Sequence, residues 1–265
     1  MNIFTQQISN NFRANILVSF PHSGTALPDH IRSQMTPAGQ STPDTDWYLD
    51  QLYEYNQLEF VNAIKANFSR YVVDLNRSPE DQPLYTDGRK LTGVVPLETF
   101  NGESIYITPP NFEDTSKRIE EFHTPYHAEI RKILDSMHQQ KRNILLFDAH
   151  SIPRHVPSIS ESPFPDLILG NNNGASCDEL IIDSAYIFLS NLGYKVTKNV
   201  PFSGGHITRS FGSPSSGIHS LQLEMSQDLY MDVPNKQLDH NKSLVMQKHL
   251  SELLTILSQQ LREIN

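Results

Sequence analysis

The sequence has very little cysteine: Cys177 is the only one in 265 residues, which excludes an internal disulfide. Such scarcity is typical of proteins from a reducing compartment. We therefore expect a cytoplasmic protein. Cys177 stands at the start of an apparent helix, and we interpret it as a small structural side chain rather than a nucleophile.

Positive charge is also scarce. The chain has 21 Lys and Arg against 30 Asp and Glu, a formal net charge of -9. Proteins that bind nucleic acid or anionic lipid carry clustered Lys and Arg, so we expect neither partner. An anionic substrate would have to be bound by a few local arginines, which overcome the repulsion from the net negative charge of the protein.

Long apolar runs are absent, since none approaches the ~18 residues of a membrane span. The first residues also lack the basic region and apolar core of a signal peptide. Stretches rich in Pro and Gly, such as residues 36–43 and 78–83, are short and read as loops rather than linkers. The sequence thus predicts one domain over residues 1–265, with no membrane association.

The chain does contain short apolar runs, typical of buried strands, that alternate with helical segments. Strands are expected at residues 16–20, 71–75, 143–147, 167–169, 194–197 and 220–225. Helices are expected after Asp44 or Asp46, over 111–141 with a kink or break at Pro125, over 178–192 and over 244–261. This alternation predicts an α/β fold, a mixed, largely parallel sheet with helices on both faces.

Three of the apolar runs end in residues that suit a metal site. They are His22 after residues 16–20, His150 after residues 144–147 and Glu224 after residues 220–223. The carboxyl ends of parallel strands meet at one sheet edge, where such folds bind ligands. Because catalytic zinc takes about three protein ligands, the pattern predicts a metal-dependent hydrolase with one divalent ion on His22, His150 and a carboxylate.

The third ligand is expected to be Asp46, because it begins the helix after the His22 loop and can turn back toward that loop. Asp44 is the nearby competitor. Either aspartate could instead be a helix N-cap, which is the commoner role at such a position.

Two further carboxylates have expected roles. Alternation puts Gln222 and Glu224 on one face of their strand, and a carboxylate beside a metal can take a proton from water and pass it to a leaving amine. Asp148 lies on the same side of its strand as His150 and could orient a ligand. Without a metal, Glu224 would be an exposed strand-end residue and Asp148 a salt-bridge partner.

Arginines are the expected substrate contacts. Arg77 directly follows the predicted strand 71–75 and should be held rigidly, although Asp74 could be its ion-pair partner. In residues 204–212, adjacent glycines that include Gly205 let backbone approach a ligand, and Arg209 can grip a carboxylate. The plainer interpretation of that segment is a hairpin with a surface arginine.

His123 and His127 are four residues apart, which resembles half of a helical metal site, but Pro125 interrupts the helix and no glutamate occupies the second position. This signal is weak. His127 is expected to line the pocket or to polarise a substrate group.

Seven segments, in order and spanning roughly residues 15 to 232, together resemble the N-formylglutamate amidohydrolase family. They are residues 21–24 (PHSG), 44–52 (DTDWYLDQL), 69–77 (SRYVVDLNR), 124–127 (TPYH), 147–151 (FDAHS), 204–209 (GGHITR) and 221–225 (LQLEM). The resemblance implies zinc-dependent hydrolysis of N-formyl-L-glutamate to formate and L-glutamate, the last step of one bacterial route of histidine breakdown. It also implies a fold similar to that of the zinc carboxypeptidases.

By this likeness His22 and His150 take the places of the first and last histidine ligands, and Glu224 that of the general base. Asn76 and Arg77 resemble the pair that holds a substrate carboxylate. Further expected substrate contacts are Ser23, Gly205 and Arg209, with Arg154 as an additional candidate arginine.

The sequence departs from the pattern at two positions. The related carboxypeptidases have a glutamate ligand where Thr25 stands, so the third ligand must come from elsewhere, and Asp46 matches the acidic position of the formylglutamate family. His206 stands where many relatives carry an aromatic residue. The alternatives are a zinc hydrolase of another N-acyl amino acid and a catalytically inactive relative that binds amino acids.

Overall fold

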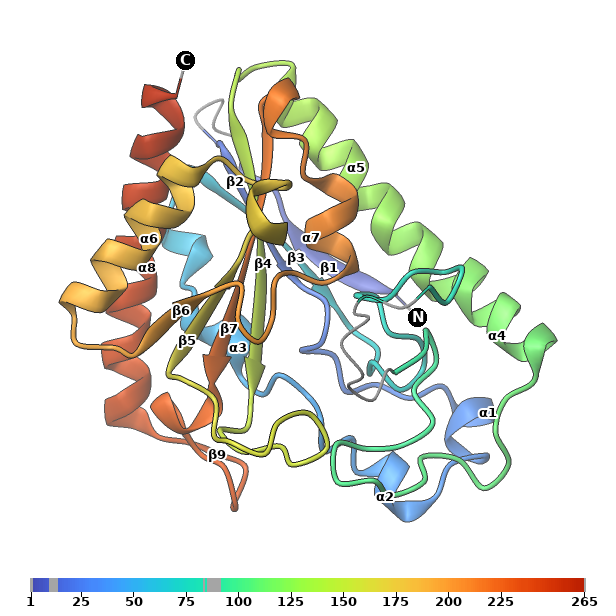
Figure 1. The fold of residues 1–265 in the computed structure, drawn as a ribbon. Coiled ribbons are helices and arrows are strands. Elements are labelled where there is room, and N and C mark those ends of the chain that lie inside the picture. Colours follow the sequence, from blue (N-terminus) through green and yellow to red (C-terminus); the bar gives the residue numbers. More distant parts are fainter. Residues whose placement is uncertain (1, 10–13, 83, 85–91, 265) are drawn as a thin grey trace.

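A seven-stranded sheet forms the centre of the computed structural model, which describes residues 2–9, 14–82, 84 and 92–264 (Figure 1). The strand order is β1-β3-β2-β4-β7-β5-β6. The strands are β1 (Phe4–Gln7), β2 (Ile16–Phe20), β3 (Val61–Ala66), β4 (Ile144–Ile152), β5 (Leu167–Gly170), β6 (Val196–Lys198) and β7 (Ile218–Ser226). A separate ribbon pairs β8 (Met231–Asp232) with β9 (Gln237–Leu238).

The sheet is mixed and mostly parallel. β3, β2, β4 and β7 run parallel to one another, whereas β1 is antiparallel to β3, and β5 is antiparallel to β7. Every residue of β2 and β4 is buried, as expected for parallel strands covered on both faces. The predicted fold class is therefore confirmed.

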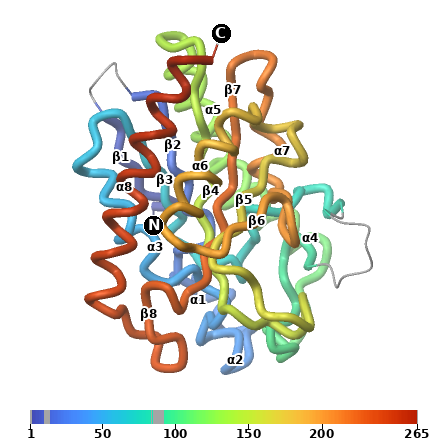
Figure 2. Tube along the Cα trace, turned by 60° about the vertical axis from the view of Figure 1, so that its left-hand side comes forward, coloured from blue at the N-terminus to red at the C-terminus, as the bar shows by residue number. Residues whose placement is uncertain are grey.

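Helices cover both faces of the sheet. They are α1 (Asp29–Arg32), α2 (Pro37–Gln40), α3 (Leu49–Leu52), α4 (Phe112–Arg118), α5 (Thr124–His138), α6 (Glu179–Asn191), α7 (His206–Phe211) and α8 (His240–Glu263). Ile16, Val18 and Phe20 of β2 pack on the side of α3, α6 and α8, and Leu17 packs on the side of α5 and α7. Figure 2 shows α8 running along one side of the molecule. None of the helices within the described residues is long and apolar enough to cross a membrane.

The long segment expected over residues 111–141 is divided near its proline. Asn111 caps α4 by accepting a hydrogen bond from the amide of Asp114 at 2.9 Å. Residues Ile119–His123 form a π-helical turn, and Pro125 lies in the first turn of α5 directly after it, so the change in helical winding falls where the proline removes an amide donor. The predicted interruption is confirmed.

Two local predictions are wrong. Residues 71–75 are not a strand, because their backbone is held in turns and the sheet position beside β2 belongs to β3. The helix after residue 46 is the short α3, with Tyr48 at its N-cap position, so neither Asp44 nor Asp46 caps it. Both carboxylates have other partners, described below.

Candidate active site

The three predicted metal ligands meet at the carboxyl ends of β2 and β4. His22 follows β2, His150 lies near the end of β4, and a backbone hydrogen bond from Asp46 N to His22 O (3.1 Å) holds the intervening loop against them. Asp46 Oδ2 lies 3.1 Å from His150 Nδ1 and 3.9 Å from His22 Nδ1. The ring centroids of the two histidines are 4.8 Å apart. Two imidazole nitrogens and one carboxylate oxygen thus form a group that could hold a metal ion.

Asp74 orients the first of these histidines. Its Oδ1 accepts a hydrogen bond from His22 Nε2 at 2.7 Å, which leaves the lone pair on Nδ1, the nitrogen that faces Asp46. Asp74 Oδ2 in turn accepts from Arg70 at 2.6 Å. Burial opposes ionisation of Asp74, but Arg70 and His22 outweigh it and hold the pKa of the carboxyl well below its usual range. Burial and the nearby Arg70 charge lower the pKa of His22, which favours the neutral ring that a metal requires.

His150 has its own supporting contacts. Its Nε2 lies 3.2 Å from Asp148 Oδ1 and 2.8 Å from Asn76 Nδ2, while its Nδ1 faces Asp46. Burial lowers the pKa of His150, but the charges of Asp148 and Asp46 outweigh burial and raise it well above its ordinary value. Asp148 therefore lies where a carboxylate that orients a ligand is expected.

The charge balance of the site suits a dication. Asp46, Asp74 and Asp148 are all buried, and Arg70 is a buried cation among them. Burial raises the pKa of nearby Glu224 to about 8, and the Asp46 and Asp148 charges act in the same direction. A divalent ion would compensate this excess of negative charge, and imidazole with carboxylate is a donor set that zinc accepts.

Glu224 is fixed beside His150 by strand register. The two residues are direct partners in the parallel pairing of β4 with β7. As predicted from alternation, Gln222 lies on the same face, and its Nε2 donates to Glu224 Oε2 at 3.4 Å. Gln222 Oε1 accepts from the backbone amide of Gly205 at 2.8 Å, which ties β7 to the segment before α7.

A cavity of about 80 Å³ opens onto these groups. Its walls are His22, Asp46, Arg70, Asn76, Arg77, Leu84, Phe100, His150, Ser151, Ile152, Ile159, Phe202, Gly205, Gln222 and Glu224. The three expected ligands, the expected base and three expected substrate contacts therefore surround one space. Asp44 is not among them, because its carboxylate accepts hydrogen bonds from Tyr71 and Phe100. Thr25 is exposed.

Arg77 is held rigidly, although not by a strand. Asp74 N donates to Val94 O (2.7 Å), and Asn76 N donates to Asp74 Oδ1 (2.9 Å), so turns and one carboxylate shape the segment. The Arg77 guanidinium donates to Thr92 Oγ1 at 3.0 and 2.8 Å. Segment 71–75 is buried and apolar like a strand, but its backbone bonds to turns and to distant side chains and loops rather than to a neighbouring strand.

Four other candidates lie outside the cavity wall. Arg209 belongs to helix α7 rather than to a hairpin, and it donates to Gly204 O and Ser203 Oγ. His127 Nε2 contacts Leu75 O at 2.8 Å. Ser23 Oγ is buried and has no hydrogen-bond partner among the described residues. Arg154 donates to two carboxylates, Asp166 and Asp228.

Sequence reasoning missed several cavity residues. Arg70 is the most important; it pairs with Asp74 four residues on, but the segment is not helical, so this spacing gave no signal of the ion pair. Phe100, Ile152 and Phe202 also line the cavity. Apolar side chains of this kind carry no chemical signal in the sequence, and only the fold reveals them.

The chain is similar to known proteins in both sequence and fold. Residues 14–231 match the family model described as N-formylglutamate amidohydrolase. Proteins named N-formylglutamate deformylase from Pseudomonas putida and Pseudomonas aeruginosa are each 38% identical over 223 residues, which cover 83% of this chain and 83% of theirs. The crystal structure of an N-formylglutamate amidohydrolase from Ralstonia eutropha JMP134 is similar in fold, with a TM-score of 0.85, 23% identity and 98% of both chains covered. A gene product of Agrobacterium tumefaciens has a TM-score of 0.71 at 14% identity, with 96% of both chains covered.

Proposed function

Because this chain belongs to the N-formylglutamate amidohydrolase family, we propose that it hydrolyses N-formyl-L-glutamate to formate and L-glutamate. The family match confirms the resemblance of the seven segments. The observation that carries the proposal is the convergence of His22, Asp46 and His150 with Glu224 around one cavity.

His22 Nδ1, His150 Nδ1 and Asp46 Oδ2 are the proposed donors for one divalent ion, zinc, which when bound supplies Lewis-acid polarisation of the formyl carbonyl and of water. Asp74 and Asp148 keep the two rings in the required orientation. The support is the donor set itself, together with the excess of carboxylates around it.

Glu224 is the proposed general base and acid. It accepts a proton from water as the oxygen of that water bonds to the formyl carbon, and it delivers the same proton to the amide nitrogen as the C–N bond breaks. Formate and the free amine of glutamate are the products. Burial raises the pKa of Glu224, and a bound dication would act in the opposite direction, which favours the carboxylate form that accepts the proton.

Asn76 and Arg77 are the proposed contacts for a substrate carboxylate. Both line the cavity, and the anchored guanidinium of Arg77 can present a planar pair of donors. Gly205 lies directly against Asn76 in the cavity wall and gives backbone access there. Ser23 and Arg209 are proposed to support substrate binding from beside the wall, Arg209 by fixing the Gly204 carbonyl.

We also propose a place for the reaction in the cell. Release of L-glutamate from a formylated precursor would end a route of histidine breakdown, as the resemblance implies. The single, buried Cys177 supports a reducing compartment, and hence the cytoplasm.

The test is formate release by the purified protein from N-formyl-L-glutamate. N-acetyl- and N-succinyl-L-glutamate are assayed in parallel as alternative substrates, by the release of acetate and succinate. We expect the formyl substrate to be preferred, since the cavity beside Glu224 is small. Glu224→Gln should retain its metal and lose ~100-fold or more in kcat, the usual range for lost proton transfer.

Glu263→Gln, at an exposed position of α8, is the matched control and should turn over at the wild-type rate. Near wild-type turnover by Glu224→Gln would remove that residue from the mechanism. Faster release from the acetyl or succinyl substrate would assign the protein to another N-acyl amino acid.

A further inference from the structure

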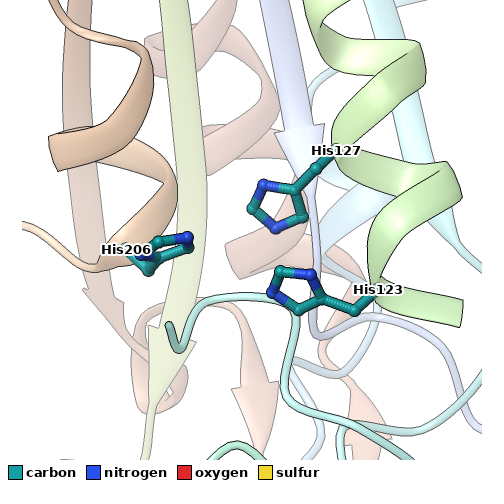
Figure 3. A group of neighbouring side chains, drawn as sticks. All are labelled: His123, His127 and His206. Atoms are coloured by element: carbon teal, nitrogen blue, oxygen red, sulfur yellow. The ribbon is translucent and has the colours of Figure 1, made fainter. Parts of the chain in front are cut away.

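Three histidines gather behind the segment that carries Asn76 and Arg77, outside the cavity wall. His123 ends the π-helical turn, His127 lies on α5, and His206 begins α7 (Figure 3). One ring nitrogen from each lies within 4.8 Å of the others. None of the three belongs to the His22, Asp46 and His150 group.

The rings are already packed against one another. His123 and His127 stack with centroids 4.1 Å apart and an angle of 10° between their planes. The His206 ring lies 5.9 Å from that of His123 and 5.4 Å from that of His127. The π-helical turn before Pro125 allows this packing, because a change in helical winding alters the direction of the His123 side chain relative to α5.

Backbone carbonyls hold the two stacked rings. His123 Nε2 donates to Arg77 O at 3.0 Å, and His127 Nε2 donates to Leu75 O at 2.8 Å. The backbone amide of His206 donates to the carbonyl between them, that of Asn76, at 3.3 Å. A carbonyl that accepts from one ring nitrogen is the usual support of a histidine that binds metal.

Burial favours the neutral form of all three imidazoles. Burial lowers the pKa of His123, and it lowers the pKa of His127 to about 3 and that of His206 to about 4. Asp74 and Glu80 lie near enough to act on His123 and His206 in the opposite direction. Neutral rings with acidic groups close by are what a cation requires, because protons do not compete for the lone pairs.

We propose that His123, His127 and His206 form a second metal site, which takes a divalent transition ion that imidazole prefers, such as Zn²⁺. Tetrahedral ligands about 2.1 Å from zinc stand roughly 3.4 Å apart, so the ring nitrogens, which lie within 4.8 Å of one another, would move closer and the stacked rings of His123 and His127 would tilt apart to close on an ion. His127 and His206 are partly exposed, which gives solvent access for a fourth ligand. The ion would be connected to the segment Leu75 to Arg77 through the hydrogen bonds that His123 and His127 make to its carbonyls. It would therefore help to fix Asn76 and Arg77 from the side away from the cavity.

The experiment measures zinc bound per chain after equilibrium dialysis, by elemental analysis, with folding checked by circular dichroism. We expect His206→Phe to bind one equivalent fewer than the wild type, and His206→Cys, which restores a zinc ligand, to recover it. The matched control is His240→Phe, an exposed histidine at the start of α8, which should bind as much zinc as the wild type.

Asp46→Ala separates the two sites, since it should remove the other equivalent and leave the histidine cluster loaded. The proposal is overturned if His206→Phe binds as much zinc as the wild type. It is equally overturned if His240→Phe loses the same equivalent, because the metal would then be adventitious surface binding.

Discussion

At the scale of single residues, Asp74 links the proposed metal site to the substrate segment. Its Oδ1 accepts hydrogen bonds from His22 Nε2 and from the backbone amide of Asn76. Its Oδ2 accepts a hydrogen bond from the guanidinium of Arg70. One fully buried carboxylate therefore orients a ligand, shapes the turn before Arg77 and neutralises a buried guanidinium.

Asp74→Asn should weaken metal binding by ~10–100-fold, the usual loss when the outer partner of a histidine ligand is removed. The amide can still accept one hydrogen bond, but it no longer carries the charge that makes His22 a better donor. The measurement is zinc affinity by competition with a chromophoric chelator. Asp50→Asn, which removes a partly exposed partner of Lys65, is the control.

The same substitution should also lower the free energy of unfolding by about 3–5 kcal/mol, because it leaves Arg70 buried without its partner. Chemical denaturation of the metal-free protein measures this loss. Unchanged zinc affinity in a folded Asp74→Asn protein would show that His22 needs no such orientation.

At the scale of elements, the segment before α7 packs closely on the substrate loop. A Cβ placed on Gly205 would lie 2.3 Å from Asn76 Nδ2 and 2.5 Å from its Cγ. Asn76 cannot move away freely, because its side-chain amide also donates to Asp148 Oδ2 at 3.2 Å and lies 2.8 Å from His150 Nε2. Glycine is required here for close approach, at an ordinary negative φ of -83°.

Gly205→Ala should therefore displace Asn76, lower kcat/KM by at least ~10-fold and reduce stability by ~1–3 kcal/mol, as overpacking does. Adding Asn76→Ala removes the clash, so the double variant should regain stability without regaining activity. Steady-state kinetics and thermal unfolding measure the two effects. If the double variant is no more stable than Gly205→Ala alone, the clash is not the cause.

Arg154 joins two loops rather than serving the cavity. It donates to both oxygens of Asp228 at 2.6 and 2.9 Å and to Asp166 at 2.8 Å. Partial burial raises the pKa of Asp228, but the hydrogen bonds from Arg154 and Ser226 outweigh it and lower the pKa below its ordinary value. The stabilisation is thus complete above the ordinary aspartate range and is lost as pH falls through the lowered value.

Arg154→Gln should lower the free energy of unfolding at neutral pH by about 1 kcal/mol or less, since the pair is partly exposed and screened. The difference from the wild type should vanish in acid, and KM should not change. Denaturation at several pH values and steady-state kinetics test both parts. A large rise in KM would return Arg154 to the list of substrate contacts.

The sequence predicted elements well where hydrophobic pattern and hydrogen bonding agree. β2 was predicted at its observed bounds, and Asp178, the N-cap of α6, stands at the predicted start of that helix. Segment 71–75 has the apolar pattern of a strand, but the backbone amide of Asp74 donates to Val94 O instead of to a neighbouring strand, and such a tertiary partner is invisible in a single sequence. β3 was missed for the same reason, since its pairing with β1 and β2 is nonlocal.

At the scale of the whole molecule, the proposed ligands come from positions 22, 46 and 150 and join the N-terminal third of the chain to its middle. An ion bound only by the folded state should stabilise the protein by about 4 kcal/mol at a thousandfold excess over Kd. We expect zinc to raise Tm by about 10 °C, and a chelator to reverse the shift.

Calorimetry with and without zinc tests this prediction. His150→Ala should lose the part of the shift that this site supplies, and an unchanged shift in that variant would contradict its role as a ligand. The control is His30→Ala, at an exposed position of α1, which should behave as the wild type does.

The meeting of His22, Asp46 and His150 could be predicted from the sequence because each follows or lies beside a strand end, and strand order brings those ends together; their role as ligands stays a proposal. The histidine cluster could not, since His206 lies 79 positions beyond His127 and only the packing of α7 on α5 brings them together. Spacing identifies partners within one element, whereas partners on different elements require the fold.

The pairing of β4 with β7 makes the proposed metal ligand and the proposed base inseparable. Side chains alternate between faces along a strand, so inserting or deleting one residue upstream in β4 would turn His150 toward α6 and α8, and the same change in β7 would do so to Glu224. Length variation in this lineage should therefore be confined to the loops, while the interiors of these two strands keep a fixed number of residues.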